Sequence, residues 1–79
     1  MVKKLNEDEM FDMEFEPLTS MLNNEYYESK ELYNLREEIF DLHFKLVVEA
    51  KDFLQKAKLK ARLSKVISDY NQLIEEGYR

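Results

Sequence analysis

The chain has 79 residues, which is enough for one domain but lies near the lower limit at which a chain buries enough apolar surface to be stable alone. It has no cysteine, which excludes disulfides and zinc–thiolate sites, and its single glycine, Gly77, excludes a glycine-rich phosphate-binding loop. Its 17 acidic and 12 basic residues give a net charge of −5, and no motif points to a known family.

Residues 1–24 form an acidic arm, in which short helical turns are predicted between residues 7 and 23. Residues 7–16 alternate six acids with large apolar side chains, a pattern typical of segments that become ordered on a partner. We favour a second interpretation, in which four apolar side chains at a 4, 3, 4 spacing form the inner face of one short helix that closes the core, namely Phe11, Phe15, Leu18 and Leu22. Pro17 would interrupt that helix, although it is also well placed as the first residue of a new turn that runs to about Asn23.

The run of residues 25–76 contains no glycine or proline and is rich in good helix formers, so a long helix is predicted at residues 25–54. Its apolar seam follows alternating steps of three and four and consists of Leu32, Leu35, Ile39, Leu42 and Leu46. A second line, spaced by seven, consists of Tyr26, Tyr33, Phe40, Val47 and Leu54. The two lines cover about half of the circumference, so this helix is expected to contact two neighbours.

A change of apolar phase separates a second helix, predicted at residues 59–76. On a straight helix its apolar stripe would lie about 180° from the first seam, so one rod would bury opposite faces at its two ends. A break at residues 55–60, with Asp52 and Ser64 as the available N-caps, gives an antiparallel hairpin that resolves this conflict. The alternative is a bent or continuous helix, because no glycine, proline or asparagine marks the turn.

The expected architecture is therefore all-α: the arm at 1–24 and the hairpin at 25–79 in a single domain. A homodimer is also expected, because the chain is too short to cover both apolar lines of its long helix; two hairpins would form a coiled-coil-like helical bundle. The residues assigned to the core or dimer seam are Leu32, Leu35, Ile39, Phe40, Leu42, Leu46 and Val47. An aspartate at Ile39 or Leu42 should unfold the protein by placing an unpaired charge in the seam.

No catalytic or metal site is predicted. His43 is the only histidine, and the residues three and four positions from it are apolar, so no pair of metal ligands forms on its helix. No serine or threonine has a nearby base or a strained turn that would make it a nucleophile. The sequence therefore indicates a protein that is not an enzyme and that binds no cofactor or metal.

The predicted function is that of a small regulatory or accessory protein that binds another protein. The candidate contacts are four aromatic residues of the arm and the start of the long helix: Phe11, Phe15, Tyr26 and Tyr33. The acids of the arm favour a partner with a basic surface, which the protein would block sterically.

Two alternatives involve nucleic acid. The basic stretch at residues 51–65 suits a nucleic-acid-binding accessory protein, with contacts from Lys56, Lys58, Lys60 and Arg62. The acidic front of the chain suits a mimic of nucleic acid. Since no secretory signal and no apolar stretch of ~20 residues is recognisable, the protein is expected to be cytoplasmic and to have no membrane contact.

Overall fold

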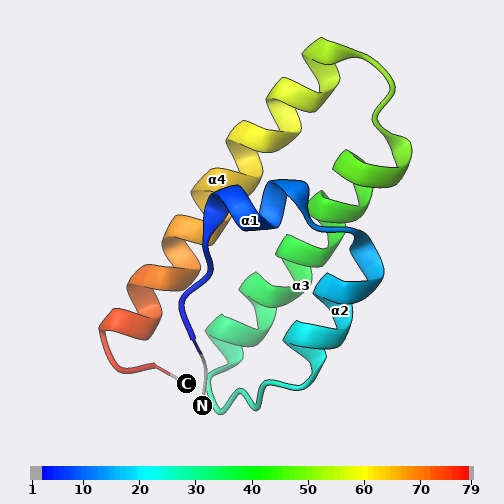
Figure 1. Ribbon diagram of the computed structural model, residues 1–79. Coiled ribbons are helices and arrows are strands. Elements are labelled where there is room, and N and C mark those ends of the chain that lie inside the picture. Colours follow the sequence, from blue (N-terminus) through cyan, green and yellow to red (C-terminus); the bar gives the residue numbers. More distant parts are fainter. Residues whose placement is uncertain (1–2, 79) are drawn as a thin grey trace.

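A computed structural model describes residues 3–78, and within them the chain is all-helical with no strand, as the sequence predicts. The α-helices are α1 (Glu7–Asp12), α2 (Phe15–Asn23), α3 (Lys30–Phe44) and α4 (Phe53–Glu75), and a π-helical segment, η1 (Lys45–Glu49), follows α3 (Figure 1). The helices pack on one another in a body of 37 × 21 × 19 Å. Residues 1, 2 and 79, at the ends of the predicted arm and hairpin, lie outside the described part of the chain.

The two short helices confirm the helical turns expected between residues 7 and 23. Asn6 caps α1, because its side chain accepts a hydrogen bond from the Glu9 backbone N–H at 3.2 Å. Pro17 lies in the first turn of α2, where a missing N–H leaves no helical hydrogen bond unmade. The side chains that these helices bury are Met10, Leu18 and Leu22.

The long helix begins at Lys30, so its predicted start at residue 25 is wrong. The helix α2 extends to Asn23, and the residues that follow form an irregular connection up to Ser29. Ser29 supplies the N-cap by accepting a hydrogen bond from the Leu32 backbone N–H at 3.4 Å. Tyr26 therefore lies in the connection and takes no part in the second apolar line of the helix.

The chain breaks at residues 50–52, between η1 and α4, and not at the predicted 55–60. In η1 the backbone widens to a π turn, which the Ala50 N–H closes by donating to the Lys45 carbonyl at 2.7 Å. Asp52 then caps α4 by accepting a hydrogen bond from the Gln55 N–H at 2.7 Å. The change in the apolar spacing at residue 59 marks where α4 begins to pack on the core. The Asp52 cap determines where the helix itself begins. The chain does not adopt the alternative of one continuous helix.

Replacing Asp52 with alanine is expected to lower the free energy of unfolding by about 1 kcal/mol, because the Gln55 N–H loses its side-chain acceptor. Chemical denaturation followed by circular dichroism measures this change. Asp52→Asn is the matched control, since asparagine keeps the acceptor and should stay within about 0.5 kcal/mol of the natural protein. Equal losses in both variants would show that the negative charge, and not the cap, stabilises the helix.

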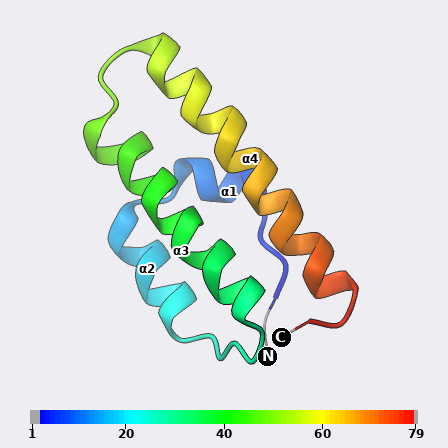
Figure 2. The ribbon, with the colours of Figure 1, turned by 180° about the vertical axis from the view of Figure 1, so that it is seen from behind.

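The seam of α3 is buried inside a single chain. In both views α4 lies alongside α3, and α1 and α2 cover this pair from one side only (Figures 1 and 2). All four α-helices and η1 contribute to one core, which consists of Met10, Leu18, Leu22, Leu32, Ile39, Leu42, Leu46, Leu63, Val66, Ile67 and Tyr70. Of the other seam residues, Leu35 and Phe40 are half-buried against this core and Val47 is exposed. A second copy of the chain is therefore not needed to cover the seam.

Polar contacts fasten both ends of the described chain. The Asn71 side chain accepts a hydrogen bond from the Leu5 N–H at 2.7 Å and donates one to the Leu5 carbonyl at 2.9 Å, which ties the segment before α1 to α4. Gly77 ends α4 with a positive φ of 96°, as expected for a C-terminal glycine stop. The Tyr78 N–H reaches back to the Leu73 carbonyl at 3.0 Å and closes a Schellman motif.

Candidate functional site

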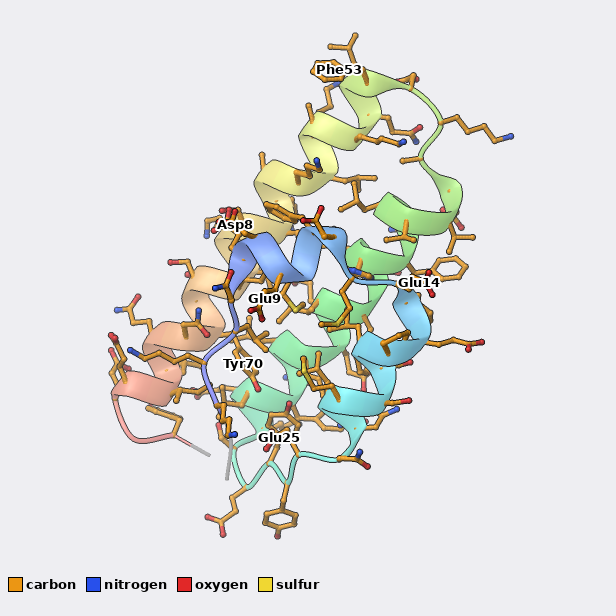
Figure 3. The ribbon with its side chains drawn as sticks, in the orientation of Figure 1. Asp8, Glu9, Glu14, Glu25, Phe53 and Tyr70 are labelled. Atoms are coloured by element: carbon orange, nitrogen blue, oxygen red, sulfur yellow. The ribbon has the colours of Figure 1, made fainter. Side chains whose placement is uncertain are left out.

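Four exposed apolar side chains lie at one end of the molecule, where η1 leads into α4. Phe53 is 84% exposed and Leu54 is 72% exposed, and Val47 and Val48 are also exposed. Figure 3 shows Phe53 at this end, opposite the end at which Glu25 lies. We call Val47, Val48, Phe53 and Leu54 the apolar tip. Single exposed apolar residues are ordinary on a protein surface, whereas a group of them is a candidate docking surface.

The tip is exposed because α4 begins beyond the rest of the core. Every residue between 53 and 58 is exposed, and the first buried side chain of α4 is Leu63. Both views show α1 and α2 away from this end, so they do not cover the first turns of α4 (Figures 1 and 2). The Asp52 cap starts the helix there although little packs on its first turns.

Sequence reasoning does not identify the tip. Val47 and Leu54 fit the second apolar line of the predicted long helix, and Phe53 belongs to neither line. The signal that would find the tip is the pair of apolar doublets at 47–48 and 53–54, on either side of the Asp52 cap. Residues that flank a turn between two helices have few neighbours on which to pack, so apolar doublets in this position point to an external partner.

Three lysines, Lys51, Lys56 and Lys58, border the apolar tip. All three are exposed, and none forms an ion pair with another residue between 3 and 78. Lys58 lines a shallow depression together with Asp52, Phe53, Leu54 and Gln55. The tip thus combines apolar side chains with positive charges that are free to pair with the acids of another molecule.

The four aromatic residues predicted to bind a partner do not form one surface, because two of them are engaged inside the protein. Phe11 and Phe15 are both half-buried. The Lys60 ammonium lies 5.7 Å from the centroid of the Phe11 ring, and the Phe15 and Phe44 rings pack edge to face at 5.2 Å. These two phenylalanines hold α1 and α2 against α4 and α3.

Tyr26 and Tyr33 are accessible on the connection before α3 and on its first turns, where the neighbouring aromatic contacts stabilise the fold. The Arg36 guanidinium lies 4.5 Å from the Tyr33 ring centroid and 5.2 Å from that of Tyr27. The Tyr27 hydroxyl is hydrogen-bonded to the Tyr70 hydroxyl at 2.9 Å, and burial raises the pKa of Tyr70 well above its ordinary value. Tyr26, at 75% exposed, is the more accessible of the two predicted contacts.

The four basic residues predicted to contact nucleic acid lie on two sides of α4. At about 100° per residue, Lys58 and Arg62 share one side, and Lys56 and Lys60 share another roughly 160° away. Lys60 faces α1, because its ammonium lies over the Phe11 ring. The four side chains therefore lie as two separate pairs on the helix.

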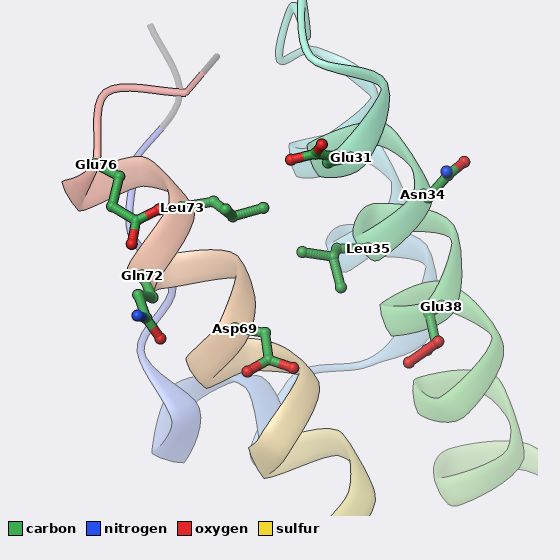
Figure 4. Close-up of a pocket in the computed structure, with 8 residues that line it drawn as sticks. All are labelled: Glu31, Asn34, Leu35, Glu38, Asp69, Gln72, Leu73 and Glu76. Carbon is green, nitrogen blue, oxygen red and sulfur yellow. The ribbon is translucent and has the colours of Figure 1, made fainter.

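A groove runs between α3 and α4 on the side that α1 and α2 leave uncovered (Figure 4). Leu35 and Leu73 point toward each other across this groove, whose volume is about 510 Å³. Carboxylates of both helices line it: Glu31, Glu38, Asp69 and Glu76. An apolar floor with an acidic rim suits an occupant that is positively charged and partly apolar. The sequence alone does not reveal this groove, because it depends on how the two helices are aligned.

His43 is buried and links two helices. Its Nε2 lies 2.9 Å from the Met10 carbonyl oxygen, so this nitrogen carries the hydrogen and joins α3 to α1. Its Nδ1 has no hydrogen-bond partner among the described residues, and the Phe15 ring stacks on the imidazole at 6.3 Å. Burial lowers the pKa of His43 below its ordinary value, and the carbonyls of Met10 and Met13 offset part of this effect.

Between residues 3 and 78, no group of three or more histidine, cysteine or acidic side chains is placed to hold a metal ion. In the same range, no helix combines the length and apolar character that crossing a membrane requires. Comparison of the chain with protein-family models, curated proteins and solved structures finds no significant match.

Proposed function

We propose that the protein is a small non-enzymatic binding protein that docks on another protein through the apolar tip. The observation that carries this proposal is the group of exposed apolar side chains at one end of the molecule, with Phe53 and Leu54 the most exposed. Burying either side chain in a partner's pocket would contribute roughly 1.5–3 kcal/mol. A protruding tip of this kind fills a pocket on its partner and thereby blocks it, so steric occlusion is the mechanism.

The partner is a protein with an acidic rim around an apolar pocket. Lys51 and Lys56 have no ion-pair partner within residues 3–78, so their charges are available to such a rim. Complementary charges would mainly increase the association rate and make binding sensitive to salt. This proposal keeps the protein-binding function expected from the sequence, but it moves the contact from the acidic arm to the tip, because Phe11 and Phe15 pack within the protein. The surface proposed for the partner is therefore acidic, and not basic as the sequence predicts.

The antiparallel hairpin and the homodimer expected from the sequence belong to the same proposal. As a hairpin, α3 and α4 would hold the tip rigidly, so little conformational entropy would be lost when it binds. A homodimer would present two tips to the partner. Two linked contacts bind far more tightly than one where the partner has two matching sites, because the second contact forms at a high effective concentration.

Replacing Phe53 and Leu54 together with serine is expected to abolish partner binding without loss of stability. Both side chains are exposed, so the free energy of unfolding should stay within about 0.5 kcal/mol of that of the natural protein. The binding partner is first captured from an extract of the native host, and its purified form is then titrated with each variant. Tyr26→Ser with Tyr33→Ser is the control, which should retain the affinity of the natural protein.

Two outcomes would overturn this proposal. The first is a partner that binds the serine variant of the tip normally but is lost from the tyrosine control. The second is nucleic acid retained at physiological salt in a mobility-shift assay and released by Lys58→Glu with Arg62→Glu. In that case the basic stretch, and not the apolar tip, would carry the function.

A further inference from the structure

One long side of the α3–α4 pair is uncovered. Figure 2, which shows the molecule from behind, has α3 and α4 in front with α1 and α2 on their far side. The groove lined by Leu35 and Leu73 lies on this side (Figure 4). The groove leaves these leucines half-buried, although they pack against the core. We call this side of α3 and α4 the uncovered face.

The uncovered face extends from the groove toward the tip. At about 100° per residue, Lys58, Arg62 and Lys65 of α4 fall on the same side as the groove residues Asp69 and Glu76. Lys45, the first residue of η1, likewise follows Glu31 and Glu38 of α3 at steps of seven residues. The charged residues of the two helices therefore form one continuous strip along the uncovered face.

The charges on this strip are ordered by sign. The acids Glu31, Glu38, Asp69 and Glu76 line the half near the start of α3 and the end of α4. The half near the tip carries the bases Lys45, Lys58, Arg62 and Lys65. The uncovered face is thus negative at one end and positive at the other.

Most of these charges are not neutralised within the chain. Two exposed ion pairs lie where the halves meet, Lys45 with Asp41 at 3.0 Å and Lys65 with Asp69 at 3.6 Å. Exposed pairs one helical turn apart hold each other weakly. Glu31, Glu38, Glu76, Lys58 and Arg62 form no ion pair with any residue between 3 and 78.

We propose that the uncovered face is the homodimer interface, and that a second copy of this chain lies on it in the reverse direction. This inference rests on the homodimer of the proposed function and names its interface. In the reversed arrangement the basic half of each copy faces the acidic half of the other, whereas two copies in the same direction would oppose like charges. A two-fold axis through the middle of the face relates the copies, so the assembly closes as a dimer.

The reversed dimer also covers the apolar floor of the groove and leaves Phe53 free. Leu35 and Leu73 would be shielded by side chains of the other copy. At about 100° per residue, Phe53 lies roughly 160° around α4 from the side of Lys58 and Arg62. The two Phe53 side chains would therefore remain accessible, at opposite ends of the dimer, whereas Leu54 lies within about 60° of the side of Lys58 and Arg62.

Charge reversal tests this interface by analytical ultracentrifugation over a range of protein concentrations. One variant carries Glu31→Lys and Glu38→Lys, and the other carries Lys58→Glu and Arg62→Glu. Each variant alone should dimerise at least about tenfold more weakly than the natural protein, since each reversal occurs twice in a symmetric interface. An equimolar mixture of the two should form a heterodimer, because the reversed acids then face reversed bases.

Two further variants are matched controls on other surfaces. Glu14→Lys with Glu16→Lys makes the same acid-to-lysine change at the start of α2. Lys56→Glu with Lys60→Glu makes the same base-to-glutamate change on the other side of α4. Both should dimerise like the natural protein, and circular dichroism of every variant shows whether it is folded.

If the natural protein remains monomeric at ~100 μM, the homodimer proposal is wrong, but the proposal that the tip docks on a partner is unaffected. A dimer that survives both reversals on the uncovered face overturns this interface. Dimers that form in the mixture of the two reversed variants, but in neither variant alone, support it.

Discussion

Replacing Ile39 with aspartate is expected to abolish the folded state at room temperature. Ile39 is fully buried where α3 meets the core. The substitution removes a packed side chain, which costs about 2–5 kcal/mol, and adds an unpaired buried charge, which costs several more. A domain of this size has about 4–12 kcal/mol of stability in total, so the cost of the change is comparable with all of it. Circular dichroism and the dispersion of amide NMR signals report the loss.

Val47→Asp is the matched control for this substitution. Val47 lies one residue beyond the seam position Leu46 and is exposed, so an aspartate there remains in water. This variant should keep the helical signal and change the free energy of unfolding by no more than about 0.5 kcal/mol. A folded Ile39→Asp protein with dispersed NMR signals would mean that α3 does not pack through this seam.

Mild acidification is expected to destabilise the protein through His43. Burial lowers the pKa of His43 in the folded protein, whereas the unfolded chain keeps an ordinary value near 6.5. Below that value the unfolded chain binds a proton that the folded protein does not, so the free energy of unfolding falls as the pH falls. The slope approaches about 1.4 kcal/mol per pH unit, until the pH reaches the lower pKa of the folded protein.

His43→Gln isolates this effect. The glutamine side chain can still donate a hydrogen bond to the Met10 carbonyl, but it does not titrate. His43 is the only histidine, so denaturation curves of the variant between pH 7 and about 5.5 should show little dependence on pH. The same slope in both proteins would assign the effect to the carboxylates instead.

The helical class of the fold is predictable from the sequence because apolar spacing and helix propensity agree along the whole chain. Leu32, Ile39, Leu42 and Leu46 were predicted as a seam from their steps of three and four, and all are buried. Helical turns in the arm were predictable from the spacing of Phe11, Phe15, Leu18 and Leu22, but this spacing does not reveal the break at residues 13 and 14, which places Phe11 in α1 and Phe15 in α2.

The ends of the helices were less predictable, because capping hydrogen bonds set them and the apolar spacing reports only where a helix packs. Ser29 and Asp52 set the starts of α3 and α4 through single side-chain hydrogen bonds, which apolar periodicity does not reveal. The change of phase at Leu59 misplaces the break, because it records where α4 meets the core and not where α4 starts.

The candidate sites were less predictable still. Phe53 and Leu54 resemble core residues in the sequence, and only the position of α4 relative to α1 and α2 shows that they are exposed. The groove between Leu35 and Leu73 depends on the alignment of two helices far apart in sequence. Conversely, Phe11 and Phe15 are equally compatible with a partner and with a core until the contacts of their rings are known.

Photo-crosslinking in the native host tests docking by the tip most directly. A benzophenone-bearing amino acid is placed at position 53 in one variant and at position 26 in another, both of which are exposed sites. If the tip is the docking surface, position 53 forms a covalent adduct with one acidic protein, the adduct is lost with Lys51→Glu and Lys56→Glu, and position 26 gives none. An adduct from position 26 without one from position 53 would contradict it.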